Sequence, residues 1–503
     1  MNLRSNGKWK RVAFYAAIFV GLMLFFVCAH PLYIFDTDDW TYISEPRVAI
    51  PEWFSWNPTR ILPEILMPFA AQVGLNCIEP LLHDYIQSLA IAFAIVLSAA
   101  IVLYLLGMDY LLQKSYKMKH ERYIVLLMML LWHFLPFCQD GTKCQHMFYA
   151  DNVTCVFYYT ISGLLNAGAA LLILAGYRVR KENSAMLNGV LLLGAYLCIN
   201  SNMYQSIILF VTVCAELFIQ WICCMRREKQ KVFSSVWTTI QKNKVKTGIA
   251  CVWIVSILLE RTGGRAQWLP DEEERGLKIA LSYFMQSLAG LNEIWLTGTL
   301  AVIIVALITC MISIKRQGDS AIKKLDSIYL HQIAVCGLCL VVSIAYIVLL
   351  SAVVKPVYLM ESKVKFSWAI WCFFMLVSSM AYLLKRMPRL VMVLPLLLCL
   401  VVSVTVADGN VYADYNLATG CSALTAKALD ENIIRQAQEA EKNGLKSVEI
   451  KIPKHESETW PLALSYGGER IARTLYRHGL TQTQLEIQLV MDEEINRQFG
   501  LEH

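Results

Sequence analysis

The chain has 503 residues, of which 57% are hydrophobic and only 17% are charged. Because soluble domains average about 45–50% apolar and about 25% charged residues, this composition excludes an ordinary soluble protein and predicts an integral membrane protein. The formal net charge of +6 is modest, so the sequence gives no reason to expect nucleic acid as a partner.

The first apolar run covers residues 12–30 and follows a basic segment that contains Arg4, Lys8, Lys10 and Arg11. No small-residue cleavage pattern follows it, so we expect a retained membrane anchor rather than a signal peptide. Together with later apolar runs it predicts about eleven membrane helices. The later runs lie near residues 85–106, 123–138, 154–175, 185–200, 203–223, 246–259, 291–314, 331–352, 366–384 and 390–406.

Residues 61–75 are also apolar, but Pro63, Glu64 and Pro68 interrupt them. This pattern favours a helix that lies at the membrane interface rather than one that crosses the bilayer.

The distribution of lysine and arginine predicts the orientation of the helices. With the N-terminus in the cytoplasm, 25 of the 45 basic residues fall in inner segments and 10 in outer loops. Every inner segment is basic, as the positive-inside rule requires, and we expect these runs to contact lipid head groups. An odd number of spans then places the long loop 31–84 and the C-terminus outside the cytoplasm.

The composition changes abruptly after Ala407, and residues 408–503 are polar. The pattern predicts a helix over 423–443, a strand over 447–452, and helical pieces over 472–479 and 485–499. We therefore expect a mainly α fold, with a polytopic membrane helix bundle over residues 1–407 and a small α/β extracytoplasmic domain over residues 408–503.

The acidic motif Asp36-Thr37-Asp38-Asp39-Trp40 follows the first predicted span by a few residues. Carboxylates at a bilayer surface are costly unless they bind something, so they form a functional hypothesis. These acids predict an active site on the outer face of the membrane. The segment Trp56-Asn57-Pro58-Thr59-Arg60 lies in the same outer loop.

This arrangement resembles the GT-C superfamily of membrane glycosyltransferases. More narrowly, it resembles the bacterial members that decorate cell-surface polysaccharides from undecaprenyl-phosphate sugars, and segments 35–40 and 56–60 carry the resemblance. Those relatives usually show Asn-Gly-Arg or a similar triplet where this chain has Asn57-Pro58-Thr59-Arg60, so the role of Arg60 stays open. The resemblance implies a multi-pass protein of the bacterial plasma membrane.

The resemblance also implies an inverting, single-displacement transfer of a sugar from a polyprenyl-phosphate donor to a cell-surface glycan or lipid acceptor. Such a reaction needs a base for the acceptor hydroxyl and positive charge for the departing phosphate. Asp38 or Asp39 would be the base, and the other, or Asp36, would orient the acceptor or a divalent cation such as Mg²⁺ or Mn²⁺.

The first candidates for the phosphate site are Arg261 and Arg265, which flank a Gly-Gly turn at the outer end of the seventh predicted span. Two arginines beside such a turn can present forked donors and backbone N–H groups to one anion. They can equally contact lipid head groups or pair with the acidic residues 271–274. Lys363 and Lys365, at the outer start of the tenth span, are second candidates.

Other polar and aromatic residues near the outer face are weaker candidates. A histidine at an interface is usually a satisfied polar group, and a tryptophan there is usually an aromatic-belt anchor. Oxygen ligands suit magnesium or manganese, although no spacing in this chain requires a metal. The candidates are Arg60, Trp40 and Trp56 for substrate, Trp53, Trp268 and Trp295 for sugar stacking, His83, His133 and His146 for acid-base chemistry, and Glu64, Asp140 and Asp151 for a cation.

Two other functional classes stay open. A transporter or flippase of lipid-linked glycans would use the same outer charges to bind cargo without chemistry, but it predicts polar groups deep in several spans and often a repeated half. The predicted spans are largely free of buried charge, and no repeat is visible. A non-catalytic protein of envelope assembly would tolerate loss of the acids at 36, 38 and 39.

Overall fold

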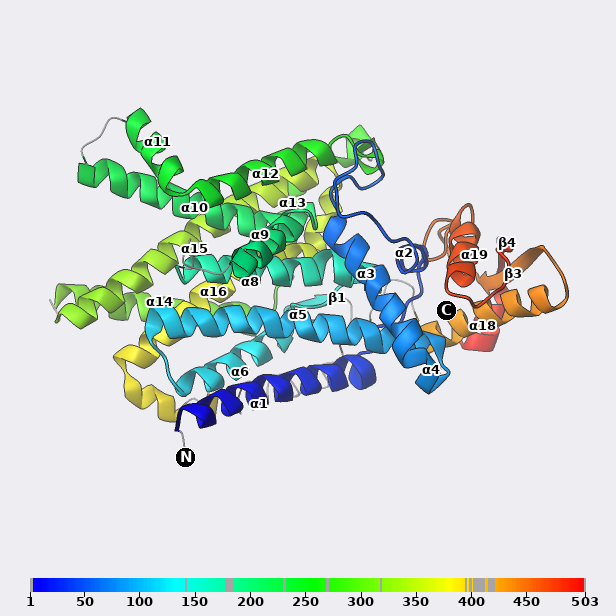
Figure 1. Cartoon of the computed structure of the whole chain (residues 1–503), viewed down its shortest axis with the longest axis horizontal. Helices are drawn as coiled ribbons and strands as arrows, with labels where there is room; N and C mark the ends of the chain where they lie inside the picture. Colours follow the sequence, from blue (N-terminus) through cyan, green and yellow to red (C-terminus); the bar gives the residue numbers. More distant parts are fainter. Residues whose placement is uncertain are drawn as a thin grey trace.

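The computed structural model describes residues 3–140, 143–176, 185–228, 232–267, 271–316, 319–393, 396–397, 400, 412–414 and 421–501. Within these ranges the protein is mainly helical, with little sheet. Eight described helices are long and apolar enough to cross a membrane (Figure 1). They are Trp9–Ala29, Ile61–Leu82, Tyr85–Tyr116, Val153–Leu174, Met203–Arg226, Glu293–Lys315, Ser320–Val353 and Ser362–Arg386.

Seven of these eight helices match predicted spans, and the eighth, Ile61–Leu82, is the segment predicted to lie at the interface. Three other predicted spans form shorter helices, α6 (Glu121–Phe134), α9 (Ala185–Ile199) and α12 (Lys244–Glu260). The predicted span 390–406 falls mostly outside the described residues. The total of eleven spans therefore stays a prediction.

The first half of the chain supplies one side of the bundle. Helix α1 (Leu3–Leu24) continues through η1 (Phe25–Ala29) and packs along α5 (Tyr85–Tyr116). In the chain, α2 (Thr37–Tyr42) follows η1. A run that is inclined to α5 in Figure 1 then leads into α5, namely α3 (Ile61–Val73), η2 (Gly74–Ile78) and α4 (Glu79–Leu82). After α6 come a two-stranded hairpin, β1 (Cys138–Asp140) and β2 (Lys143–Gln145), and the continuous run α7 (Val153–Cys155), η3 (Val156–Ile161) and α8 (Ser162–Leu174).

The second half continues with α10 (Met203–Glu228), α11 (Val232–Lys242) and α12, then η4 (Gly264–Gln267), η5 (Glu272–Glu274) and α13 (Leu277–Ala289). Helices α14 (Glu293–Lys315), α15 (Ser320–Val353), η6 (Pro356–Met360), α16 (Ser362–Arg386) and η7 (Pro388–Met392) follow. Helix α16 is almost wholly buried between its neighbours, whereas α14 exposes apolar side chains on most of its surface. An exposed apolar surface of this size suits contact with lipid.

Apart from Glu64 of α3, three carboxylates are buried within the candidate spans, namely Asp109 of α5, Glu216 of α10 and Asp326 of α15. The expectation that the spans are largely free of buried charge is therefore wrong at these positions. Each carboxylate has fixed partners, because an unpaired buried charge is strongly destabilising. The partners are Arg11 and Arg122 for Asp109, Lys246 and His331 for Glu216, and Ser313 and Tyr382 for Asp326.

The C-terminal elements gather at the end of the bundle opposite the N-terminus (Figure 1). They are α18 (Ala423–Lys442), β3 (Ser447–Pro453), α19 (Gly467–Arg477), β4 (Glu486–Asp492) and α20 (Glu493–Phe499), with β3 and β4 paired in parallel. The helix over 423–443 and the strand over 447–452 are confirmed. The prediction of a helix over all of 485–499 is wrong for residues 486–492, because Ile487 and Leu489 alternate with polar residues and face the core of the sheet.

Candidate active site at helix α2

Helix α2 carries the acidic motif, and Asp36 is its N-cap. Asp36 adopts an extended backbone conformation, and its Oδ1 accepts a hydrogen bond of 2.8 Å from the backbone N–H of Asp39. This is the N-cap arrangement that starts a helix, and carboxylates in the first turn also interact favourably with the helix dipole. The motif therefore forms this short helix itself.

Asp39 holds α2 against the rest of the protein. Its Oδ1 accepts hydrogen bonds from the backbone N–H (2.6 Å) and the hydroxyl (2.7 Å) of Thr154 in α7, and its Oδ2 accepts one from the backbone N–H of Phe35 (3.2 Å). The second carboxylate oxygen of Asp36 accepts a hydrogen bond from the amide of Asn152. Both Asp36 and Asp39 are buried. Their oxygens are thus occupied by donors that fix the position of the helix.

Asp38 differs from its two neighbours, because its side chain is exposed. No hydrogen bond to its carboxylate is found among the described residues. The protein still encloses it in part, and this desolvation raises the pKa of Asp38. The positive charges of Arg265, Arg60, Arg470 and Lys363 oppose that rise, in this order of size. Asp38 is therefore an accessible carboxylate whose pKa several cations lower.

Burial also raises the pKa of the two locked carboxyls. The pKa of Asp36 lies well above its ordinary value because of desolvation and the nearby charges of Asp39 and Asp38. Desolvation raises the pKa of Asp39 to about 6, although the hydrogen bonds from Thr154 and Phe35 lower it. The charge of Asp38 thus opposes ionisation of both Asp36 and Asp39.

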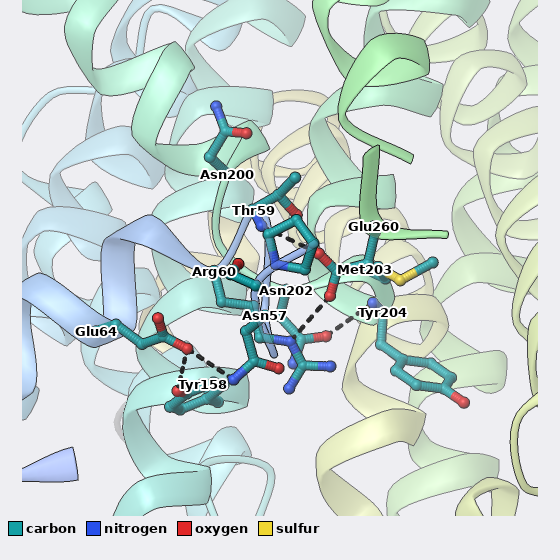
Figure 2. Close-up of polar contacts among 12 residues, drawn as sticks. Asn57, Thr59, Arg60, Glu64, Tyr158, Asn200, Asn202, Met203, Tyr204 and Glu260 are labelled. Atoms are coloured by element: carbon teal, nitrogen blue, oxygen red, sulfur yellow. Dashed lines mark hydrogen bonds and ion pairs between the residues drawn. The ribbon is translucent and has the colours of Figure 1, made fainter. Parts of the chain in front are cut away.

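The Trp56–Arg60 motif meets the end of α12, and Glu260 joins the two. Glu260 Oε2 accepts hydrogen bonds from the backbone N–H (3.1 Å) and the hydroxyl (2.6 Å) of Thr59, and Oε1 pairs with Nε of Arg60 at 3.3 Å (Figure 2). The Arg60 guanidinium also lies 5.5 Å from the ring centroid of Tyr158. This geometry orients Arg60 through Nε and leaves its two terminal nitrogens for another anion.

The glycines beside Arg265 are explained by close packing rather than by an open anion-binding turn. A Cβ atom on Gly263 would lie 2.5 Å from Cδ of Pro58, and one on Gly264 would lie 3.0 Å from the ring of Trp56. The backbone N–H of Arg265 donates to the carbonyl of Trp56 at 3.2 Å. The Trp56–Arg60 motif and the Gly-Gly turn before Arg265 therefore lie against each other.

The two predicted arginines take different positions. Arg265 is half-buried, and the Tyr159, Tyr358 and Tyr42 hydroxyls and Asp38 raise its pKa despite its burial. Arg261, which caps α12, is exposed. The structure therefore associates Arg265 with the acidic motif and does not bring Arg261 to it.

Lys363 lies at the start of α16, where two carboxylates neutralise it. Its ammonium group pairs with Asp151 and, at 3.0 Å, with Glu361, and it lies 5.4 Å from the ring centroid of Tyr159. Lys363 affects Asp38 through its charge, but its hydrogen bonds go elsewhere. Lys365 is buried.

The C-terminal elements complete the surroundings of α2, which the sequence did not predict. The hydroxyl of Thr474 in α19 donates to the carbonyl of Trp40 at 2.6 Å, and the backbone N–H of Thr37 donates to the carbonyl of Pro461 at 3.0 Å. Helix α19 also brings Arg470 toward Asp38. No local pattern signals these contacts, since they join residues more than 400 positions apart in the chain.

The remaining candidates are dispersed. Trp40 is fully buried, Trp56 is half-exposed at 47%, Trp53 is exposed and Trp295 is buried. His83 is exposed, and His133 and His146 are buried among aromatic rings. Trp268 and the side chain of Asp140 lie outside the described residues.

The candidate cation ligands do not converge. Glu64 is occupied by the hydroxyl of Tyr158, the amide of Asn57 and the guanidinium of Arg47, all at 2.7–2.8 Å. Asp151 pairs with Lys363. Within the described part of the chain, no group of three or more His, Cys, Asp or Glu residues is arranged to hold a metal ion. Of the described candidates, Glu64 and Asp151 are thus engaged by other partners.

Comparisons of this chain with family models, with curated protein sequences and with solved structures find no match.

Proposed function

We propose that this protein is a membrane glycosyltransferase that moves a sugar from a polyprenyl-phosphate donor to a cell-surface glycan or lipid acceptor. We place the reaction on the outer face of a bacterial plasma membrane, with about eleven spans, the N-terminus in the cytoplasm and the C-terminus outside. The observation that supports the proposal best is the exposed carboxylate of Asp38, whose pKa is lowered by the charges of Arg265, Arg60 and Arg470.

Asp38 is the proposed general base. A base needs a lone pair that the acceptor hydroxyl can reach, so geometry is considered before pKa. The pKa of about 6 would suit Asp39 for proton transfer near neutral pH, but its oxygens are occupied by Thr154 and Phe35. Asp38 has a raised pKa and an exposed carboxylate, which leaves Asp36 and Asp39 the role of positioning α2.

The proposed step is a single displacement. Asp38 takes the proton of the acceptor hydroxyl while the acceptor oxygen forms a bond to the anomeric carbon of the sugar. The bond from that carbon to the phosphate oxygen breaks on the opposite face, its electron pair leaves with the polyprenyl phosphate, and the anomeric configuration inverts. Arg60 and Arg265 stabilise the charge on the departing phosphate, because forked guanidinium donors match phosphate oxygens.

The experiment is an assay of sugar transfer from a polyprenyl-phosphate-linked sugar by the full-length protein in membranes. We expect Asp38→Asn to lower transfer by about 100-fold or more, as for loss of a general base. The matched control is Arg435→Ala, which replaces an exposed arginine of α18 that pairs with Glu439. This variant should transfer sugar normally. Normal transfer by a correctly inserted Asp38→Asn protein would refute the assignment, and no transfer by the wild type from any such donor would refute the function.

Transport of a lipid-linked glycan is the second candidate, and the buried charges of the spans favour it. Asp109, Glu216 and Asp326 are polar groups of the kind that substrate pathways use. Their fixed partners argue for structural roles instead. Movement of a fluorescent lipid-linked glycan across vesicles that lack an acceptor would favour transport, whereas transfer without such movement would favour the enzyme.

A further inference from the structure

A cavity lies beside the candidate active site, between α3, the segment that follows α2, and α19. Its volume is about 760 Å³, and the side chains that define it are Glu45, Arg47, Ile65, Phe69, Arg473 and Arg477. This volume lies within the range of about 300–1,000 Å³ that is usual for small-molecule sites. Asp38, Arg60 and Arg265 do not line it, so it is distinct from the surroundings of Asp38.

One wall of the cavity is apolar. Ile65, Pro68 and Phe69 recur at the spacing of one face of α3, with Gln72 at the end of that face. Phe69 is 62% exposed, so this face offers apolar surface to a ligand. Since α3 is apolar and inclined to the long helices, its exposed face suits the boundary between acyl chains and head groups.

The opposite wall is basic. Arg473 and Arg477 lie one turn apart on α19. Arg473 pairs with Glu45 and with Glu469, so two carboxylates occupy its donors. Arg477 is exposed, and one of its terminal nitrogens donates to the carbonyl of Ser44 at 2.7 Å. No other partner of Arg477 is found in the part of the chain that the structure describes, so donors remain on its guanidinium.

Arg47, at the floor of the cavity, adds no free positive charge. It pairs with Glu64 at 2.8 Å and donates to the carbonyls of Asn57 and Pro58. Arg477 is therefore the cation that is available to a ligand, and the apolar face of α3 lines the same cavity.

We propose that this cavity binds the phosphate group of a membrane lipid. The phosphate lies against Arg477, whose planar guanidinium presents paired donors to phosphate oxygens, and the first carbons of the lipid chain lie along Ile65 and Phe69. A soluble anion would have no use for the apolar wall, and a neutral lipid would leave the arginine without a counterion. The inference does not depend on sugar transfer, because both a phospholipid and a polyprenyl phosphate carry this chemistry.

The test measures lipid binding by native mass spectrometry of the full-length protein in detergent. The probes are a polyprenyl phosphate, phosphatidylglycerol and polyprenol, which lacks the phosphate. The variants are Arg477→Ala, Phe69→Ala and the control Arg435→Ala, each with its melting temperature measured. Because Phe69 is exposed, Phe69→Ala should leave the fold intact. It therefore tests the proposal even if Arg477→Ala, which loses the hydrogen bond to Ser44, disturbs α19.

We expect the wild type to bind at least one of the two phosphate lipids and not polyprenol. Arg477→Ala should weaken that binding by about tenfold or more, as for loss of a charged hydrogen bond. Phe69→Ala should weaken it several-fold, and Arg435→Ala should have no effect. Preference for the polyprenyl phosphate would identify a substrate-like lipid, and equal binding of both would identify a general lipid-phosphate site.

Two results would overturn the proposal, namely equal binding of polyprenol and polyprenyl phosphate, or unchanged binding by both Arg477→Ala and Phe69→Ala. The proposal is also separable from the proposed function. Asp38→Asn should bind the phosphate lipids normally, because Asp38 does not line the cavity.

Discussion

Thr154→Val should destabilise the protein in a pH-dependent way, because it removes one of the donors that hold Asp39. The Thr154 hydroxyl lies 2.7 Å from Asp39 Oδ1, and both groups are buried. A hydrogen bond to a charged group is worth roughly 1.5–3 kcal/mol and one between neutral groups roughly 0.5–1.5 kcal/mol. Valine keeps the shape of threonine, so the loss should come mainly from this bond.

The sign of the pH dependence follows from the raised pKa of Asp39. Its folded pKa of about 6 exceeds the ordinary value of 3.8, so its contribution to stability is most favourable below pH 4 and is lost as the pH rises through about 6. Removing the Thr154 hydroxyl raises the folded pKa further, since that bond favours the ionised form. The deficit of Thr154→Val should therefore grow from about 1 kcal/mol at low pH to about 2 kcal/mol above pH 7.

The assay is thermal unfolding of the purified protein in detergent at pH 4.5 and pH 8, with Thr154→Ser as the matched control. Serine keeps the hydroxyl, so its deficit should be the same at both pH values. An equal loss of melting temperature for Thr154→Val at both pH values would refute the role given to this hydrogen bond.

Two further predictions concern the contact between the Trp56–Arg60 motif and the end of α12. Gly263→Ala should destabilise the protein by about 1–3 kcal/mol, because its Cβ would lie 2.5 Å from Pro58, whereas Gly248→Ala, with nothing within 4 Å, should be harmless. Equal melting temperatures of the two variants would contradict the packing argument. Glu260→Gln should raise the Michaelis constant for donor by roughly tenfold with a smaller change in kcat, because Arg60 loses its orienting charge. An unchanged constant in steady-state kinetics would remove Arg60 from donor binding.

The parts of the site that local sequence predicted are those that depend on nearby residues. Asp36 caps its own helix, and the acidic motif follows the first apolar run, so both could be read from the chain. The role of each acid could not, because Asp39 is locked by Thr154 and Asp36 by Asn152, more than 100 residues away. Asp38 differs from Asp36 and Asp39 in the exposure of its side chain, which the local sequence does not reveal.

The same limit applies to the C-terminal elements. The sequence predicted residues 408–503 as a separate domain, and its helix and first strand are confirmed. It gave no sign that Thr474 and Arg470 of α19 would contact or approach the acidic motif. The strand over 486–492 could have been predicted from its alternation of Ile487 and Leu489 with polar residues.

The most direct test of the central claim compares Asp38→Asn with Asp39→Asn in one preparation, measuring sugar transfer and melting temperature together. We expect Asp38→Asn to keep the melting temperature of the wild type and to lose transfer, because its side chain is exposed and is the proposed base. We expect Asp39→Asn to melt at a lower temperature and to keep measurable transfer, since the amide would replace an acceptor beside the Phe35 N–H. Loss of transfer at full stability in Asp39→Asn, with normal transfer in Asp38→Asn, would contradict the claim.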